Sequence, residues 1–197
     1  MNARDSKSSR ATKAHALFRV SAAPQQRARV RKLVREGQLV QMGRGIYRVA
    51  DAPLESHEDL ALVALRKPEA VVCLLSALRF HELTIESPGS VWIAVENHSR
   101  PPRIDTLQLR VHYFSGPAFR EGVEVHQIAG VPVKIYSVAK TLADCFKFRN
   151  QIGTKTAVEA LREAWQKKKV TTEDLYRSAR VCRVLNIMRP YLEGMLE

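Results

Sequence analysis

Three arginines recur at every fourth position in the segment QQRARVRKLVRE, residues 25–36: Arg27, Arg31 and Arg35. In a helix this spacing places them on one stripe, because residues four apart lie on the same face. Guanidinium groups bind phosphate oxygens and guanine edges through paired hydrogen bonds. The stripe therefore predicts contact with nucleic acid, and a solvated basic face is the alternative.

The next segment, GQLVQMGRGIYRV at residues 37–49, contains two apolar-alternating runs on either side of Gly43-Arg44-Gly45. A phosphate-binding loop would need a helix after its glycines, so that amide groups point at the anion. A second β-rich run follows instead, which predicts a hairpin with Arg44 near its tip. A basic helix followed by a hairpin is typical of a winged helix-turn-helix. The candidate DNA-binding residues are Arg27, Arg31, Lys32, Arg35, Arg44 and Arg48.

The charge of the chain is concentrated near its beginning. Residues 1–50 contain twelve Lys and Arg but only two acidic residues, so they carry +10 of the formal net charge of +12. A polyanion is the natural partner of such a segment. Double-stranded DNA is favoured over a membrane because no apolar face, lipidation signal or run of about 18 apolar residues accompanies the charge. We therefore expect a cytoplasmic protein without membrane contact.

Catalytic chemistry has weaker support in the sequence. Asp105, Glu124 and Lys134 lie on or near successive strand candidates and resemble the acidic and lysine residues of a metal-dependent nuclease. Such a site normally has a lysine two residues after the acid, but His126 stands there. No HExxH or GxSxG pattern occurs, and three widely spaced cysteines in apolar stretches indicate buried free thiols. We expect no enzyme activity, metal or cofactor.

The order of predicted elements divides the chain into three parts. Residues 1–12 are expected to form a flexible basic tail, residues 13–52 a winged helix-turn-helix-like domain, and residues 53–197 a larger C-terminal domain. TKAHALFRV predicts a short helix before the basic helix, which Gly37 should close. Only VSAAPQ separates the two, so one supporting helix of the DNA-binding domain is shortened or absent.

The C-terminal part has the pattern of an α+β domain. SHEDLALVALRK predicts a helix capped by Ser56, and VVCLLSALRFHEL is compatible with a second helix. Four strand candidates follow, of which the last two should pair through Ala129-Gly130, and the remaining chain is helical with Ser137 and Thr172 as N-caps. This order predicts a mostly antiparallel sheet of about four strands followed by C-terminal helices.

Five segments occur in the order found in a known protein family: LVREGQLVQMGRGIYRV, LLSALRFHELT, SVWIAV, GVPVKIYSVAKTLADCFKFRN and VCRVLNIMRPYLEGM. They resemble the AbiEi family of antitoxins from type IV toxin-antitoxin systems over about residues 30–193. The resemblance implies a winged helix-turn-helix followed by an antitoxin domain in a bacterial or archaeal regulator. Such a protein represses its own promoter and neutralises a nucleotidyltransferase-like toxin, without requiring a stable complex with it.

The resemblance also points to basic positions in the C-terminal domain. The residues that match the family signature, and would form a basic surface of the antitoxin domain, are Lys140, Lys147, Arg149, Arg183 and Arg189. The alternative is that they form structural ion pairs with Asp144 and Glu193. A second functional hypothesis is an interaction protein that neutralises the toxin without sequence-specific DNA binding. The oligomeric state is left open.

Overall fold

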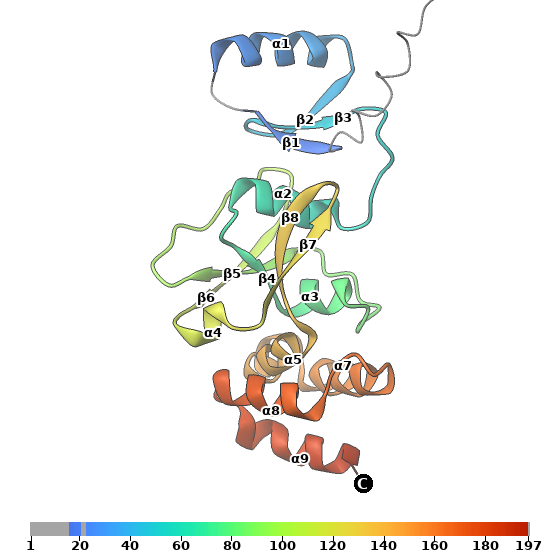
Figure 1. The fold of residues 1–197 in the computed structure, drawn as a ribbon, viewed down its shortest axis with the longest axis vertical. Helices are drawn as coiled ribbons and strands as arrows, with labels where there is room; N and C mark the ends of the chain where they lie inside the picture. Colours follow the sequence, from blue (N-terminus) through green and yellow to red (C-terminus); the bar gives the residue numbers. More distant parts are fainter. Residues whose placement is uncertain (1–15, 21–22, 197) are drawn as a thin grey trace, which may run out of the picture.

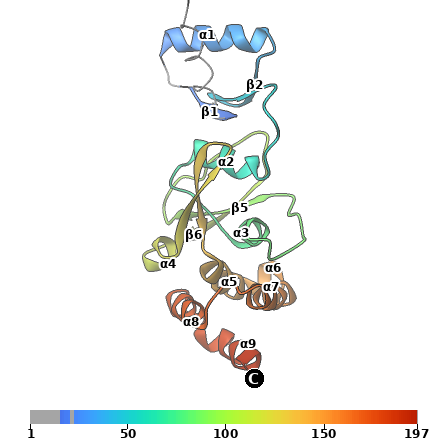
Figure 2. The same cartoon turned by 45° about the vertical axis from the view of Figure 1, so that its right-hand side comes forward.

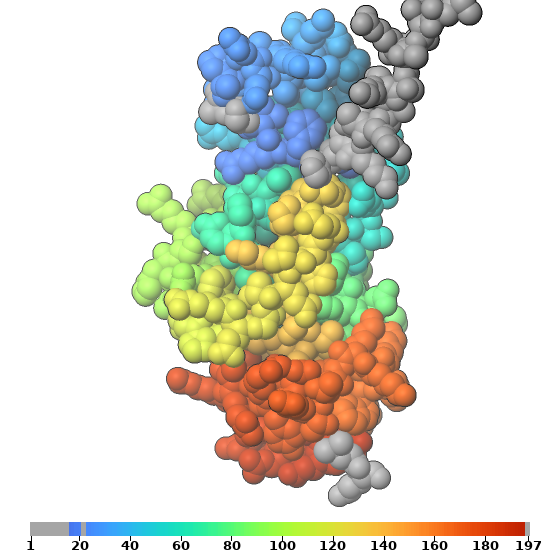
Figure 3. Space-filling model, viewed as in Figure 1, coloured from blue at the N-terminus to red at the C-terminus, as the bar shows by residue number. Residues whose placement is uncertain are grey.

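The computed structural model describes residues 16–20 and 23–196, and the predicted tail at residues 1–12 lies outside them. The molecule is elongated, with its N-terminal elements at one end and its C-terminal helices at the other (Figures 1 and 3). The α+β class predicted from the sequence is confirmed: the described residues form nine helices and two sheets, of three and five strands. None of these helices is long and apolar enough to span a bilayer.

The N-terminal elements are β1 (Leu17–Arg19), α1 (Pro24–Arg35), β2 (Leu39–Gly43) and β3 (Ile46–Val49). The strands form an antiparallel sheet in the order β1-β3-β2, and α1 lies over the face that points away from the rest of the molecule (Figures 1 and 2). The sequence predicted a short helix over TKAHALFRV. For the described residues of this segment the prediction is wrong, because Leu17–Arg19 form a strand that pairs with β3. Such a short strand depends on a distant partner, which sequence periodicity does not reveal.

The junctions around α1 and the hairpin follow the predicted glycine positions. Gly37 has a φ of +72° and ends α1, where its amide donates to the carbonyl of Val34. Gly45, with a φ of +74°, forms the β2–β3 turn beside Arg44, and the register shifts by a bulge between Gln41 and Gly43. The predicted hairpin is therefore confirmed, with Arg44 at its turn.

The larger region contains a five-stranded sheet in the order β6-β5-β4-β8-β7. The sequence predicted about four strands, and the additional one is β4, a strand of only two residues at the centre of the sheet. The sheet is mixed and not mostly antiparallel, because β4 pairs parallel to β8 and β5 pairs parallel to β6. The strands are β4 (Val71–Val72), β5 (Val91–Glu96), β6 (Leu109–Phe114), β7 (Val123–Ile128) and β8 (Val131–Tyr136). The predicted hairpin of β7 and β8 is confirmed.

The helices of the larger region lie on the two faces and at the far end of this sheet (Figures 1 and 2). One face packs on α2, and the other packs on α3 and α5, while α7, α8 and α9 pack against α5. The helices are α2 (Glu58–Arg66), α3 (Leu74–Phe80), α4 (Pro117–Arg120), α5 (Val138–Lys147), α6 (Arg149–Ile152), α7 (Thr154–Gln166), α8 (Thr172–Val181) and α9 (Leu185–Leu196).

The predicted helix caps agree with the structure in one case of three. Ser137 caps α5, since its hydroxyl accepts from the amide of Lys140. The cap of α8 is Thr171, one residue before the predicted Thr172. Ser56 does not cap α2. The N-cap residue is His57, which has a left-handed backbone conformation and forms no side-chain cap hydrogen bond.

The N-terminal sheet and the larger region share one apolar core. Leu17 of β1 and Ile46 of β3 are almost fully buried and pack in the same cluster as Leu60 and Ala61 of α2. The opposite face of the small sheet presents Phe18 and Tyr47 toward α1, and their rings lie 6.4 Å apart. The three-stranded sheet is thus held on α2, and α1 lies at the outer end of the molecule.

Candidate nucleic-acid interface

Helix α1 divides into a packed side and a basic side. Pro24 stands in its first turn, where the missing amide hydrogen costs nothing, and Gly37 follows its end. Val30 is buried, and Leu33 and Val34 are half-buried. This agrees with the helical spacing that the sequence predicted. The remaining surface of α1 is free to meet a ligand.

The basic side of α1 holds no acidic residue. Its exposed cations are Arg27, Arg29, Arg31, Lys32 and Arg35. Only Lys32 forms an ion pair with a described residue, at 3.8 Å from Glu36, and both of those side chains are largely exposed. Exposed pairs of this kind contribute little stability. The four arginines are therefore not neutralised by any described residue.

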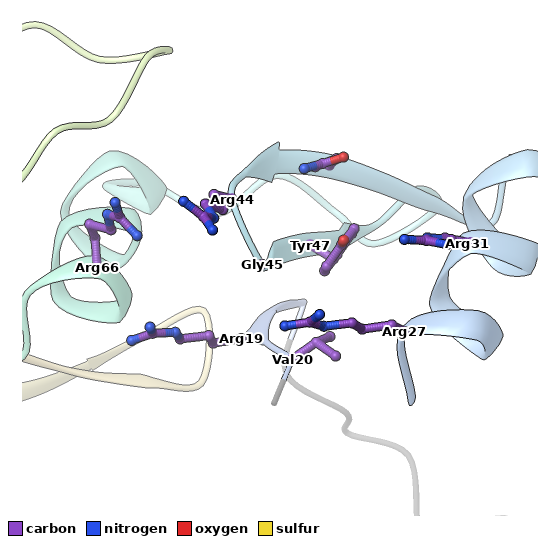
Figure 4. Close-up of a pocket in the computed structure, with 9 residues that line it drawn as sticks. Arg19, Val20, Arg27, Arg31, Arg44, Gly45, Tyr47 and Arg66 are labelled. Carbon is purple, nitrogen blue, oxygen red and sulfur yellow. The ribbon is translucent and has the colours of Figure 1, made fainter. Parts of the chain in front are cut away.

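A hollow of about 700 Å³ lies between α1, the end of β1, the β2–β3 turn and the end of α2. Arg27 and Arg31 extend from α1 into this space, which Arg44 and Arg66 border from the opposite side (Figure 4). Arg19 follows β1 along the same space. Five guanidinium groups from four separate elements thus border one hollow. Its remaining lining residues are Val20, Gln41, Gly45 and Tyr47.

The electrostatics of the hollow favour an anion. None of its lining residues is acidic, and the five arginines form no ion pair with a described residue. Two like charges a few ångströms apart repel, and the repulsion grows as the surroundings become less polar. An anion that accepts hydrogen bonds from several guanidinium groups relieves this repulsion. Phosphate groups have the geometry for paired hydrogen bonds with arginine.

Arg48 is not part of this surface, although the sequence predicted that it binds DNA. It points from β3 toward α2, on the same face of the strand as Ile46, and is buried. Its Nε donates to Glu58 at 3.0 Å, and its Nη2 donates to the carbonyl of Ala52 at 2.7 Å. All of its hydrogen bonds stay inside the protein. The prediction for Arg48 is therefore wrong, because strand alternation places it on the buried face.

Two arginines of the hollow were missed by the sequence-based selection. Arg19 was assigned to a helix, whereas it ends β1 and its Nη1 donates to the carbonyl of Leu65 at 3.4 Å. Arg66 belongs to α2 in the larger region and joins the site only through the packing of α2 under the small sheet. No local pattern distinguishes Arg66 from other surface arginines. The excess of arginine in residues 1–50 was the one available signal for Arg19.

Lys140, predicted on the basic surface of the second domain, is buried inside it. Its Nζ lies 2.5 Å from Oδ2 of Asp144, and these side chains are 1% and 0% exposed. The same ammonium lies 3.9 Å from the ring centroid of Tyr136, and the Cys182 thiol donates to Oδ1 of Asp144. The surface prediction is wrong for Lys140, and the alternative of a structural pair with Asp144 is confirmed for it.

Burial shapes the protonation of this network. It raises the pKa of Asp144, and the positive charge and hydrogen bond of Lys140 oppose that effect. It also raises the pKa of the Cys182 thiol to about 12, so that the thiol stays protonated and donates at neutral pH. The network is closed within the core. It joins α5 to the end of α8, and its side chains are too deeply buried to contact a partner protein.

The other four predicted basic residues of the second domain remain near the surface. Lys147 and Arg149 lie at the α5–α6 junction, where Arg149 is half-buried and donates to the carbonyl of Phe146 at 3.0 Å. Arg183 and Arg189 are exposed, at the α8–α9 junction and on α9. None of the four forms an ion pair with a described residue, Glu193 included. They occupy the helical end of the molecule, opposite to α1.

The acidic and lysine residues weighed as a nuclease site have other surroundings. Asp105 is exposed in the loop before β6. Glu124 on β7 accepts from His126 at 3.1 Å, and Lys134 pairs with Val125 in the neighbouring strand. Among the described residues, no three His, Cys, Asp or Glu side chains are grouped so that they could hold a metal ion.

The resemblance to the AbiEi family gains no support from comparison with known proteins. The sequence matches no model of a protein family, and its comparison with curated proteins gives no significant match.

Proposed function

We propose that this chain binds double-stranded DNA through the basic side of α1 and the β2–β3 turn. The observation that carries the proposal is the group of arginines on α1 that no described acidic residue neutralises, beside Arg44 and the hollow. A duplex presents closely spaced phosphates, and arginines arranged along a helix and a hairpin can contact them together.

The arrangement also supports a winged helix-turn-helix layout. In that layout α1 enters the major groove and the hairpin reaches the backbone or minor groove. The strand order β1-β3-β2, with a helix between β1 and β2, is compatible with it. A single helix connects these two strands in place of the helix pair of a full helix-turn-helix. We therefore expect phosphate contacts to contribute more than base contacts.

The biological role in this proposal comes from the family resemblance. The chain would repress its own operon by binding the promoter, and residues 53–197 would neutralise a nucleotidyltransferase-like toxin. The exposed Lys147, Arg183 and Arg189, together with the half-buried Arg149, are the remaining candidates for the antitoxin surface. The alternative is a toxin-neutralising protein that does not bind DNA with sequence specificity.

A DNA-binding titration with the region upstream of its own gene tests the proposal. The Arg31→Ala/Arg35→Ala variant should bind DNA at least tenfold more weakly than the unchanged protein. Each substitution removes charge-assisted hydrogen bonds to phosphate, which are stronger than neutral hydrogen bonds. Arg162→Ala/Arg180→Ala is a matched control that also removes two charges, because both arginines are exposed, on α7 and α8, at the other end of the molecule. Equal affinity of the Arg31→Ala/Arg35→Ala variant and the control would overturn the DNA-binding assignment.

The salt dependence of binding gives a second measurement. If about five phosphates are contacted, the logarithm of the binding constant should fall with the logarithm of salt concentration at a slope of about −4 to −5. The Arg31→Ala/Arg35→Ala variant should have a slope smaller by about 2, because two phosphate contacts are lost. Binding to an unrelated duplex of equal length measures how much of the affinity depends on sequence.

Co-expression with the toxin encoded beside this gene separates the two roles. Under the proposal, Arg31→Ala/Arg35→Ala loses promoter repression and still restores growth. The variant Lys147→Ala/Arg183→Ala/Arg189→Ala should keep promoter repression and fail to restore growth. Unchanged repression by a variant that no longer binds DNA in vitro would favour the toxin-neutralising alternative.

A further inference from the structure

The hollow beside α1 contains arginines that a simple helix-in-groove contact would not need. Arg29, Lys32 and Arg35 lie on α1 outside the hollow. Arg19 and Arg66 come instead from β1 and α2, below the helix, and border the hollow together with Arg27 and Arg31 (Figure 4). The hollow is thus a concave feature that is distinct from the outer side of α1.

The size of the hollow fits a ligand larger than a single phosphate group. Its volume of about 700 Å³ falls within the range of small-molecule sites. Its cations surround the space from several sides, with Arg27 and Arg31 on one side and Arg44 and Arg66 on the other. A single phosphate could approach one side only. A row of adjacent phosphate groups could contact both sides at once.

The hydrogen-bonding capacity of the arginines points to the same ligand. Arg19 donates one weak hydrogen bond to a backbone carbonyl, and the side chains of Arg27, Arg31, Arg44 and Arg66 show no hydrogen bond to a described residue. Each guanidinium has five N–H donors in a planar fork. The hollow therefore offers many charged donors and no carboxylate that competes for them.

We propose that this hollow is a binding site for adjacent phosphate groups, such as the consecutive phosphates of a DNA strand or of a free nucleotide polyphosphate. The proposal refines the proposed function by assigning a ligand to the hollow. It does not depend on sequence-specific recognition by the outer side of α1. Both sources present adjacent anionic phosphate oxygens to the arginines, although a deoxyribose separates the phosphates of DNA and one oxygen atom joins those of a polyphosphate, and the experiment below distinguishes them.

Calorimetric titration of the full chain with inorganic tripolyphosphate tests the site. We expect one tripolyphosphate per chain, with an affinity at least tenfold above that of orthophosphate, because only the longer anion contacts both sides of the hollow. Arg66→Gln and Arg44→Gln should each weaken the binding about tenfold. Arg35→Gln, which removes the same charge outside the hollow, should leave it within about twofold.

The Arg44 side chain forms no hydrogen bond or ion pair with a described residue and stands at the hairpin turn, so its substitution is not expected to disturb folding. If Arg66→Gln does not fold, the Arg44→Gln variant still tests whether the hollow binds tripolyphosphate. Equal affinities for tripolyphosphate and orthophosphate would overturn the proposal. So would an equal loss of affinity in Arg35→Gln and Arg44→Gln, because the anion would then bind to diffuse charge.

DNA titration of the same variants identifies the source of the phosphates. If the hollow holds the DNA backbone, Arg66→Gln lowers DNA affinity, and tripolyphosphate competes with DNA. If it holds a free polyphosphate, Arg66→Gln weakens tripolyphosphate binding about tenfold and leaves DNA affinity unchanged. DNA binding that depends on Arg35 without any selective tripolyphosphate binding would refute the polyphosphate site and leave the proposed function standing.

Discussion

The Nε of Arg48 lies 3.0 Å from a carboxylate oxygen of Glu58, and their side chains are only 9% and 12% exposed. This pair joins β3 of the small sheet to the first turn of α2. Arg48 also donates to the carbonyls of Val49 and Ala52. The contact therefore fixes the position of the β2–β3 hairpin, and with it Arg44, relative to the larger region.

Replacing Arg48 should affect stability more than DNA affinity. Arg48→Met leaves Glu58 largely buried without its cation, and the loss of one partner of a buried pair costs about 3 kcal/mol. Urea denaturation measures this free energy of unfolding. The double variant Arg48→Met/Glu58→Met should recover much of the loss. A DNA affinity that falls more strongly than that of Arg31→Ala, in fully folded Arg48→Met, would contradict the buried role of Arg48.

Removal of residues 1–52 should destabilise the larger region. Leu17 and Ile46 cover the side of α2 that carries Leu60 and Ala61, so truncation exposes apolar surface of the shared core. We expect the fragment 53–197 to bind a hydrophobic dye and to unfold at a lower temperature than the full chain. A fragment with the thermal stability of the full chain would show that the small sheet does not contribute to this core. Point variants are consequently the better means of separating DNA binding from toxin neutralisation.

Local sequence patterns predicted the elements whose signals are local. The spacing of Val30, Leu33 and Val34 identified α1, and Gly37 marked its end, because left-handed backbone favours glycine. Ala129-Gly130 marked the β7–β8 turn, where both residues have positive φ. These features depend on neighbouring residues only.

The features that the sequence did not reveal depend on distant partners. The three residues of β1 and the two of β4 are too short to show periodicity and exist because β3, β5 and β8 bond to them. Arg66 enters the hollow only through tertiary packing. For Arg48 and Lys140, a signal was present: Arg48 alternates with Ile46 on the buried face of β3, and Lys140 precedes Asp144 by one helical turn in an apolar segment.

A methyl group at Gly122 should disturb the buried Lys140. Gly122 has a φ of +70°, and a Cβ at this position would lie 2.6 Å from the Cβ of Lys140. Gly122→Ala therefore combines left-handed strain with a steric overlap, and we expect a loss of about 2 kcal/mol in the free energy of unfolding. Gly37→Ala is the matched control, since Gly37 has a similar φ of +72° but no atom lies within 4 Å of its added Cβ. Equal stability of the two variants would contradict the close packing of Gly122 on α5.

The effect of removing the Lys140 charge should grow with pH. Burial already raises the pKa of Asp144, and Lys140→Met removes the main opposing charge. Between the unfolded and the folded pKa, the folded carboxyl retains a proton that the unfolded chain has released, so stability falls as pH rises. Urea denaturation at pH 5 and pH 8 should show a larger loss at pH 8, of about 3 kcal/mol or more. Lys140→Met/Asp144→Asn should lack this pH dependence, and its persistence there would exclude Asp144 as the cause.

Protonation of His81 should weaken the fold below about pH 6.5. Its Nε2 lies 2.7 Å from the carbonyl oxygen of Tyr136, and burial lowers the pKa of the ring, although that hydrogen bond and Glu124 oppose the shift. Because the folded pKa is below the unfolded value, the unfolded chain binds the proton first, and stability decreases as pH falls through this range.

The variant His81→Gln tests this, because it removes the titrating group and keeps an N–H donor. The free energy of unfolding should therefore fall less between pH 7.5 and 5.5 in this variant than in the unchanged protein. His57 and His112, whose pKa values burial also lowers, contribute to the acid sensitivity that remains. Identical pH dependence in both proteins would show that His81 does not contribute.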